Sequence, residues 1–226
     1  MKKNILLVLI IFAMLLVIAA LVINGLGLLD PAPAEATPAP DTAVTPVPQE
    51  TAAAEPDVLF VAVERVPDAM VIAMERAKAA GLANVFFIDA DVARLRDYFS
   101  PDEVERIYIN FCDPWPSKRH AKRRLTHGNF LKLYRQVLKM GGQIHFKTDN
   151  QPLFEFSVEE LPQFGFELSE VTRNLHENGP VGVMTDYEAK FHELGQPINR
   201  CVGTMVDWEE SEVPEDAEPA EETVKE

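Results

Sequence analysis

IYINFCDPWP, residues 107–116, carries the pattern that decides the fold. Its first half is an apolar run typical of a buried strand, and its second half is an acid followed by two prolines, which predicts a rigid loop. Ligands of open parallel sheets bind outside the carboxyl ends of the strands. Asp113 and Trp115, followed by the basic segment 118–124 (KRHAKRR), therefore predict a site for a nucleobase at this sheet edge.

The segments around this stretch alternate between strand and helix patterns. Apolar runs predict strands over residues 58–63, 84–88 and 143–147, and helical spacing predicts helices over residues 67–80 and 126–139. Alternation of this kind predicts an α/β fold with a doubly wound, mostly parallel sheet.

Carboxylates follow the predicted strands where each strand ends: Glu64, Asp89, Asp113 and Asp149. The carboxyl ends of parallel strands share one edge, so we expect these acids to lie together. One of them alone could be an ordinary loop acid, whereas four in register favour a binding site. Cys112 and Cys201 lack metal-ligand spacing, and no metal site is expected.

The N-terminus carries an uninterrupted apolar run from Ile5 to Ile23, which would span roughly 28 Å as a helix, close to the thickness of a bilayer core. We therefore expect residues 1–29 to form a transmembrane anchor or signal-like helix, with membrane contact through residues 5–29 and a single-pass membrane localisation. A cleaved signal peptide is the alternative, although its apolar region is usually shorter. Lys2 and Lys3 predict a cytoplasmic N-terminus, which would place the rest of the chain outside the cytoplasm, whereas an active domain is expected inside the cytoplasm.

The remaining chain divides by composition into a Pro/Ala-rich linker (30–56), a globular domain (57–205) and an acidic, disordered tail (206–226). The tail holds ten acids and one lysine, so its net charge of −9 leaves only −6 of the total −15 for the rest of the chain. The acidic average therefore does not exclude a nucleic-acid partner, because the basic segment is a local concentration of positive charge.

Several ordered blocks of the chain resemble the bacterial tRNA (guanine-N7)-methyltransferases, which use S-adenosylmethionine. The resemblance covers about residues 56–200 and rests on NFCDPWP (110–116), KRHAKRRLT (118–126), HFKTDN (145–150), TDYE (185–188) and GQPI (195–198). It implies a Rossmann-like methyltransferase fold, S-adenosylmethionine as cofactor, tRNA as partner, and methylation of guanine N7.

The resemblance also implies roles for the matching residues. Glu64 would bind the ribose hydroxyls of the cofactor, Asp89 would meet its adenine region, and Asp113 would act as the catalytic residue between methyl donor and guanine. Contacts to the substrate tRNA would come from Asp149, Thr185, Asp186, Tyr187 and Glu188.

The residues themselves support a similar chemistry. Asp113 can accept hydrogen bonds from guanine N1–H and the amino group, and Trp115 could stack on the base or simply brace the loop. The position of the basic segment directly after the site favours phosphate contacts by Arg119, Lys122, Arg123 and Arg124.

The sequence upstream of Pro56 departs from the family pattern. There the family has a further strand ending in Glu and a glycine-rich loop for the cofactor, whereas the hydrophobic span and linker take that place here. We therefore expect an N-terminally truncated domain preceded by a single hydrophobic helix. Two alternatives to an active enzyme stay open: a catalytically inactive, membrane-tethered remnant that binds tRNA, and a truncated reading frame without a stable product.

Overall fold

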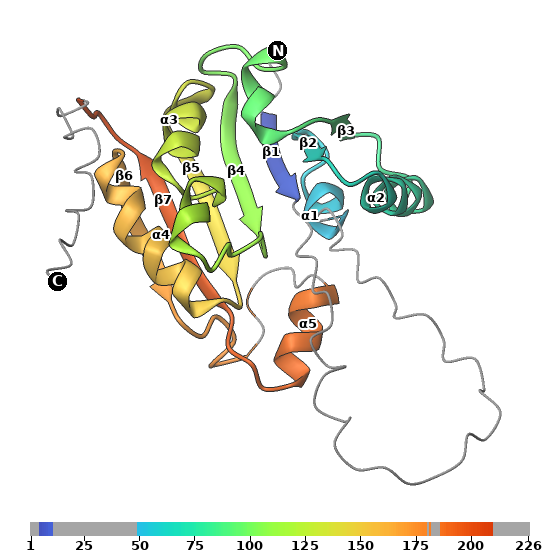
Figure 1. Cartoon of the computed structure of the whole chain (residues 1–226). Helices are drawn as coiled ribbons and strands as arrows, with labels where there is room; N and C mark the ends of the chain where they lie inside the picture. Colours follow the sequence, from blue (N-terminus) through green and yellow to red (C-terminus); the bar gives the residue numbers. More distant parts are fainter. Residues whose placement is uncertain (1–4, 11–48, 180, 182–185, 210–226) are drawn as a thin grey trace, which may run out of the picture.

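The computed structural model describes residues 5–10, 49–179, 181 and 186–209, which build one seven-stranded sheet with helices on both faces (Figure 1). The strands are β1 (Ile5–Ile10), β2 (Leu59–Glu64), β3 (Val85–Asp89), β4 (Val104–Asn110), β5 (Leu138–Thr148), β6 (Phe166–Thr172) and β7 (Asn199–Met205). The helices are α1 (Gln49–Ala54), α2 (Pro67–Ala79), α3 (Gly128–Arg135), α4 (Gln151–Gln163) and α5 (Asp186–Glu193), with 3-10 helices η1 (Val92–Asp97) and η2 (Lys118–Arg123).

The strand order is β3-β2-β1-β4-β5-β7-β6. The first five strands in this order pair in parallel, and β7 pairs antiparallel with both β5 and β6. The prediction of an α/β fold with a mostly parallel sheet is thereby confirmed. The direction of winding reverses between β1 and β4, and ligands of doubly wound sheets bind outside the strand ends at such a point.

β1 is the largest correction to the sequence-based expectation. Residues 5–10 form a strand that pairs in parallel with β2 on one side and β4 on the other, with Leu7 opposite both Val61 and Ile107. A strand buried on both faces and a membrane helix share the same unbroken apolar signature, so periodicity could not separate them.

The predicted single-pass membrane localisation is therefore wrong, and the predicted membrane contact through residues 5–29 is not supported. Residues 5–10 belong to the sheet, and none of the helices in the described part of the chain is long and apolar enough to cross a bilayer. Residues 11–29 of the predicted anchor, residues 30–48 of the linker and residues 210–226 of the tail lie outside the described residues.

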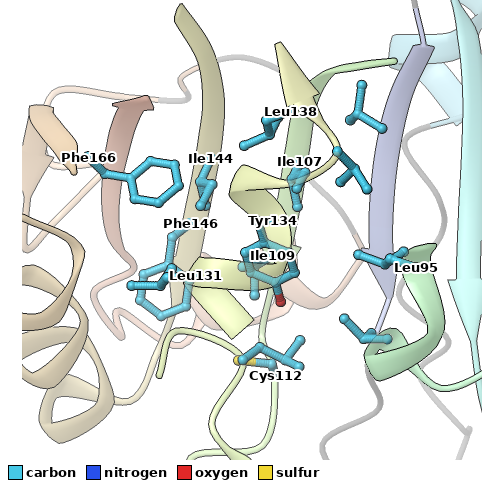
Figure 2. Close-up of a cluster of buried hydrophobic side chains, with 14 of the residues drawn as sticks. Leu95, Ile107, Ile109, Cys112, Leu131, Tyr134, Leu138, Ile144, Phe146 and Phe166 are labelled. Atoms are coloured by element: carbon cyan, nitrogen blue, oxygen red, sulfur yellow. The ribbon is translucent and has the colours of Figure 1, made fainter. Parts of the chain in front are cut away.

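The main core lies between one face of the sheet and η1, α3 and α4 (Figure 2). Figure 2 shows Leu131 and Tyr134 of α3 gathered with Ile107 and Ile109 of β4 in this cluster. Phe146 of β5 stacks on a phenylalanine of α4 with ring centroids 6.2 Å apart. Each buried side chain of this size contributes roughly 1.5–3 kcal/mol. A smaller cluster on the opposite face joins the sheet to α1 and α2.

Two boundaries differ from expectation. The helix predicted over residues 126–139 is shorter, since α3 stops at Arg135, and β5 begins at Leu138 and runs through Gly141 and Gly142. α1 lies inside the predicted linker and is tied to the domain by Asn84, whose Nδ2 donates to the carbonyls of Ala52, Glu55 and Val58 at 2.9, 3.0 and 3.0 Å.

Candidate functional site

A cavity of about 440 Å³ opens beyond the carboxyl ends of β2, β3 and β4, on the β2/β3 side of the switch point. Three short segments that follow these strands form its wall, together with the basic segment and α3. The lining residues are Val63, Glu64, Arg65, Val66, Ala90, Asp91, Val92, Asp113, Trp115, Lys122, Arg123, Leu125 and Phe130. Glu64 and Asp113, predicted from their places after successive strands, therefore meet in one site.

Glu64 is the buried acid of this cavity, with 4% of its surface exposed. Its Oε1 accepts hydrogen bonds from the backbone N–H groups of Arg65 and Val66, both at 2.7 Å. Its Oε2 is buried without a hydrogen-bond partner among the described residues. Burial raises the pKa of Glu64, and the two backbone hydrogen bonds oppose that rise. The carboxylate is thus fixed through one oxygen and can accept from a ligand through the other.

Asp91, rather than Asp89, is the acid that β3 contributes to the cavity. Asp89 is the last residue of β3, pairs in register with Glu64, and is exposed outside the cavity lining. Asp91 Oδ1 accepts from the backbone N–H of Ala93 at 2.9 Å, and its other oxygen lies 3.4 Å from Arg65. An acid directly before an apolar run is a helix-start signal, and that signal could have identified Asp91 from sequence.

The loop after β4 brings Asp113 and Trp115 to the cavity, and two of its residues have a left-handed backbone conformation. Phe111 has φ 51° and Trp115 has φ 41°, values that residues other than glycine rarely adopt. The half-buried Asp113 has a raised pKa because burial disfavours its charge, while Arg65 acts in the opposite direction. The charge of Asp113 also contributes to the raised pKa of Glu64.

The basic segment closes the other side of the cavity, and its members have different surroundings. Lys122 and Arg123 are exposed and line the cavity, and the Arg123 guanidinium lies over the Trp115 ring at 4.8 Å. Arg119 is exposed on η2. Arg124 is half-buried and donates hydrogen bonds to the loop itself, to the carbonyls of Pro114 and Trp115. The basic segment therefore combines exposed cations with one internal cation.

Asp149 follows β5 and is half-buried. Burial raises the pKa of Asp149. Burial together with the charges of Asp113 and Asp149 raises the pKa of the Cys112 thiol to about 12, which makes that thiol unreactive at neutral pH. Asp149 is not one of the described residues that line the cavity, so the four predicted acids are divided between the cavity and its surroundings.

Glu188 is buried in an ion-pair network instead of being presented to solvent. Its carboxylate accepts from Lys147 Nζ at 3.0 and 3.1 Å and lies 2.8 Å from His176 Nε2. The exposed fractions of the Glu188 and His176 side chains are 0% and 3%. The backbone N–H of Val181 donates to His176 Nδ1, which leaves Nε2 as the nitrogen that donates to Glu188.

This network ties α5 to β5 at the carboxyl edge of the sheet, and α5 lies beyond the arrowhead of β4 in Figure 1. Asp186 and Tyr187 form the first turn of α5, and the structure does not describe their side chains. Thr185 lies outside the described residues. Glu188 thus fixes the position of α5, the helix that also carries Asp186 and Tyr187, two of the residues predicted to contact tRNA.

Comparison with solved structures supports the fold. Fibrillarin, a pre-rRNA processing protein of Methanococcus jannaschii, aligns over 92% of this chain and 68% of its own with a TM-score of 0.53 and 14% identity. TrmN from Thermus thermophilus aligns over 91% of this chain and 45% of its own with a TM-score of 0.52 and 18% identity. At these identities the likeness shows a shared Rossmann-like α/β fold.

Sequence comparison defines the class of protein. Residues 45–201 match the family model described as "Putative methyltransferase". The tRNA (guanine-N(7)-)-methyltransferase of Macrococcus caseolyticus is 45% identical over 152 residues, which are 67% of this chain and 72% of the relative. The enzyme of the same name from Geobacillus kaustophilus is 48% identical over 67% of this chain and 70% of its own.

The fold and the matching family model thus define a methyltransferase of the doubly wound α/β class. Within that class, this chain belongs to the tRNA (guanine-N7)-methyltransferase family.

Proposed function

We propose that this protein transfers a methyl group from S-adenosylmethionine to N7 of a guanine in tRNA. The observation that carries the proposal is the cavity at the strand ends, where the buried Glu64 and the loop acid Asp113 face one space in a member of this family. A site limited to tRNA binding would not require a buried carboxylate oxygen without a partner, and no observation on the described residues favours that alternative.

The cavity fits a nucleoside cofactor by size and by chemistry. Its volume of about 440 Å³ lies within the range of roughly 300–1,000 Å³ common for small-molecule sites. Glu64 Oε2 is the acceptor that vicinal ribose hydroxyls need, and an acid at the end of a neighbouring strand binds ribose in other doubly wound folds. Val66 and Val92 supply apolar surface for an adenine ring, and Asp91 stands beside them.

Bound S-adenosylmethionine supplies an electrophilic methyl group on a sulfonium. Guanine N7 has a lone pair, so the nitrogen–carbon bond can form as the carbon–sulfur bond breaks and its electrons return to sulfur. No proton has to leave N7, and the protein therefore needs no strong general base. The work left to its residues is to hold the base in line with the methyl group.

Asp113 is the residue we assign to this positioning. Its carboxylate lines the cavity and can accept hydrogen bonds from guanine N1–H and the exocyclic amino group. Its negative charge also favours the positive charge that the purine ring gains on methylation. Trp115 lines the same cavity and offers a planar surface on which a base can stack.

The tRNA contacts are assigned to the surfaces around the cavity. Arg119, Lys122 and Arg123 are exposed on or beside η2, where they can neutralise phosphates. The start of α5, fixed by Glu188, and the half-buried Asp149 lie at the carboxyl edge of the sheet near β5. These surfaces support a substrate larger than a free nucleoside.

The direct test is incorporation of a labelled methyl group from S-adenosylmethionine into unmodified tRNA, followed by mapping of 7-methylguanine. We expect incorporation by the full chain and a loss of at least 100-fold with Asp113→Ala, because the base loses its orienting acceptor. Asp57→Ala is a matched control, since Asp57 is an exposed acid outside the cavity lining. tRNA binding without any methyl transfer would refute the proposal.

A further inference from the structure

Arg124 differs from the other cations of the basic segment because it is bonded to the loop that carries Asp113 and Trp115. Its Nε donates to the carbonyl of Pro114 and its Nη2 donates to the carbonyl of Trp115, both at 3.0 Å. Its guanidinium also lies over the ring of Phe156 in α4, 4.5 Å from the centroid. Arg124 thus links the loop after β4 to a helix of the main core.

The two carbonyls that Arg124 holds belong to the peptide groups on either side of Trp115. The relative orientation of these two peptide planes is set by φ and ψ of Trp115, and φ is 41°, in the left-handed region. A guanidinium is planar and presents its donors in a fixed fork. The two hydrogen bonds of Arg124 therefore fix both planes at once and hold a backbone conformation that the residue type disfavours.

This conformation decides where the indole of Trp115 lies. The ring lines the cavity, with the Arg123 guanidinium over its face at 4.8 Å and His120 against it edge-on at a centroid distance of 5.7 Å. If Trp115 relaxed to negative φ, the peptide planes would rotate and the indole would leave this place. Asp113, two residues earlier in the same loop, would lose its fixed position as well.

We propose that Arg124 is a positioning residue that holds Trp115 in its left-handed conformation, and so sets the aromatic wall of the guanine site. The inference rests on the proposed function for its catalytic consequence, but not for its structural one. It divides the basic segment between two tasks: Arg123 and Lys122 face the cavity and the substrate, whereas Arg124 faces inward and holds the loop.

The first readout reports on Trp115 directly. The chain has two tryptophans, Trp115 and Trp208, so a Trp208→Phe background leaves Trp115 as the sole indole fluorophore. In that background we expect Arg124→Lys to shift the emission of Trp115 and to increase its quenching by acrylamide about twofold or more. A lysine keeps the charge but is a point donor that cannot match the fork. Unchanged emission and quenching in Arg124→Lys would overturn the proposal.

The second readout separates positioning from phosphate binding. We expect Arg124→Lys and Arg124→Ala to lower kcat by about 10- to 100-fold, since misplacement of a positioned base by about 1 Å can cost on the order of 100-fold. The slope of log Kd for tRNA against log salt should stay at the wild-type value. The matched control Arg123→Ala should instead reduce that slope by about 0.7–0.9, the effect of one lost phosphate contact.

The outcomes distinguish this inference from the proposed function. Wild-type kcat in Arg124→Lys, or a fall in salt slope equal to that of Arg123→Ala, would show that Arg124 acts as a simple cation and would overturn the inference. If Arg124→Ala does not fold, Arg124→Lys decides alone. If the wild-type protein transfers no methyl group, the proposed function fails, while the fluorescence comparison still tests the clamp on Trp115.

Discussion

Removal of the Glu188 carboxylate tests how the substrate side of the site is held together. Glu188 is fully buried and accepts from Lys147 Nζ through both oxygens and from His176 Nε2. Glu188→Ala leaves the ammonium of Lys147 and the ring of His176 without their acceptor. Loss of one partner of a buried ion pair costs about 3–5 kcal/mol. Lys147 retains 19% exposure and can turn toward water, which places the expected cost near the lower end of that range, about 3 kcal/mol.

This loss of stability should be confined to α5 and should not extend to the rest of the domain. A further attachment of α5 among the described residues is the packing of Phe191 against a small cluster of Phe111, Leu175 and Ile198. Elements with few apolar contacts open separately from the core. A cost of about 3 kcal/mol corresponds to roughly a 100- to 200-fold increase in the population of undocked α5. The main core around β4 and β5 should keep its stability.

Native-state hydrogen exchange measures this directly. Amides of α5 should exchange roughly 100- to 200-fold faster in Glu188→Ala, with β4 amides unchanged, and the KM for tRNA should rise while cofactor affinity stays constant. Glu193→Ala is the matched control, because Glu193 is an exposed acid on the same helix. Equal exchange in α5 for wild type and Glu188→Ala would refute the role of the network, and so would uniform acceleration across the sheet.

Three other perturbations address the loop, the basic segment and β1. Burial raises the pKa of Asp113 in the folded protein above its ordinary value of 3.8. The protonated side chain is therefore favourable to folding: its contribution to the stability of the protein is fully present below pH 3.8 and is lost as the pH rises through the raised pKa of the folded state. Asp113→Asn should therefore melt at a higher temperature than wild type at pH 7, with a smaller difference at pH 4, and an unchanged or lower melting temperature at pH 7 would contradict the assigned burial. Arg119→Ala and Lys122→Ala should each weaken tRNA binding and reduce the salt slope by about 0.7–0.9; slopes equal to wild type would exclude phosphate contacts. Leu7→Pro should lower the melting temperature strongly and Leu7→Ile should not, because proline cannot donate to the ladders of a central strand; equal melting temperatures would refute the placement of β1.

The sequence predicts the strands β2, β3 and β4 and two acids of the site, Glu64 and Asp113. The runs before Glu64, Asp89 and Asp113 have strand length and end at an acid or a proline, so β2, β3 and β4 follow from local pattern. The meeting of Glu64 and Asp113 follows from the shared edge of parallel strands. These inferences need no knowledge of side-chain packing.

The rest depends on contacts between residues distant in sequence. The apolar run at residues 5–10 suits a membrane helix and a buried strand equally. It forms a strand because it pairs with β2 on one side and β4 on the other, and this pairing is not visible in the local sequence. The pairing of Glu188 with Lys147 spans 41 positions and leaves no local signal. Arg124 is indistinguishable from Arg123 by sequence, yet one holds the loop and the other lines the cavity. β6 and β7 lie after the last strand that the sequence predicts, and the sequence pattern predicts neither of them.

Calorimetric titration of S-adenosylmethionine into the full chain tests the central claim most directly. We predict a single site that Glu64→Gln weakens roughly 10- to 150-fold, the effect of replacing charge-assisted hydrogen bonds worth about 1.5–3 kcal/mol. Glu75→Gln, a change at an exposed acid outside the cavity lining, should bind like wild type. Absence of binding to the wild-type chain, or equal affinity in Glu64→Gln, would contradict the assignment of this cavity to the methyl donor.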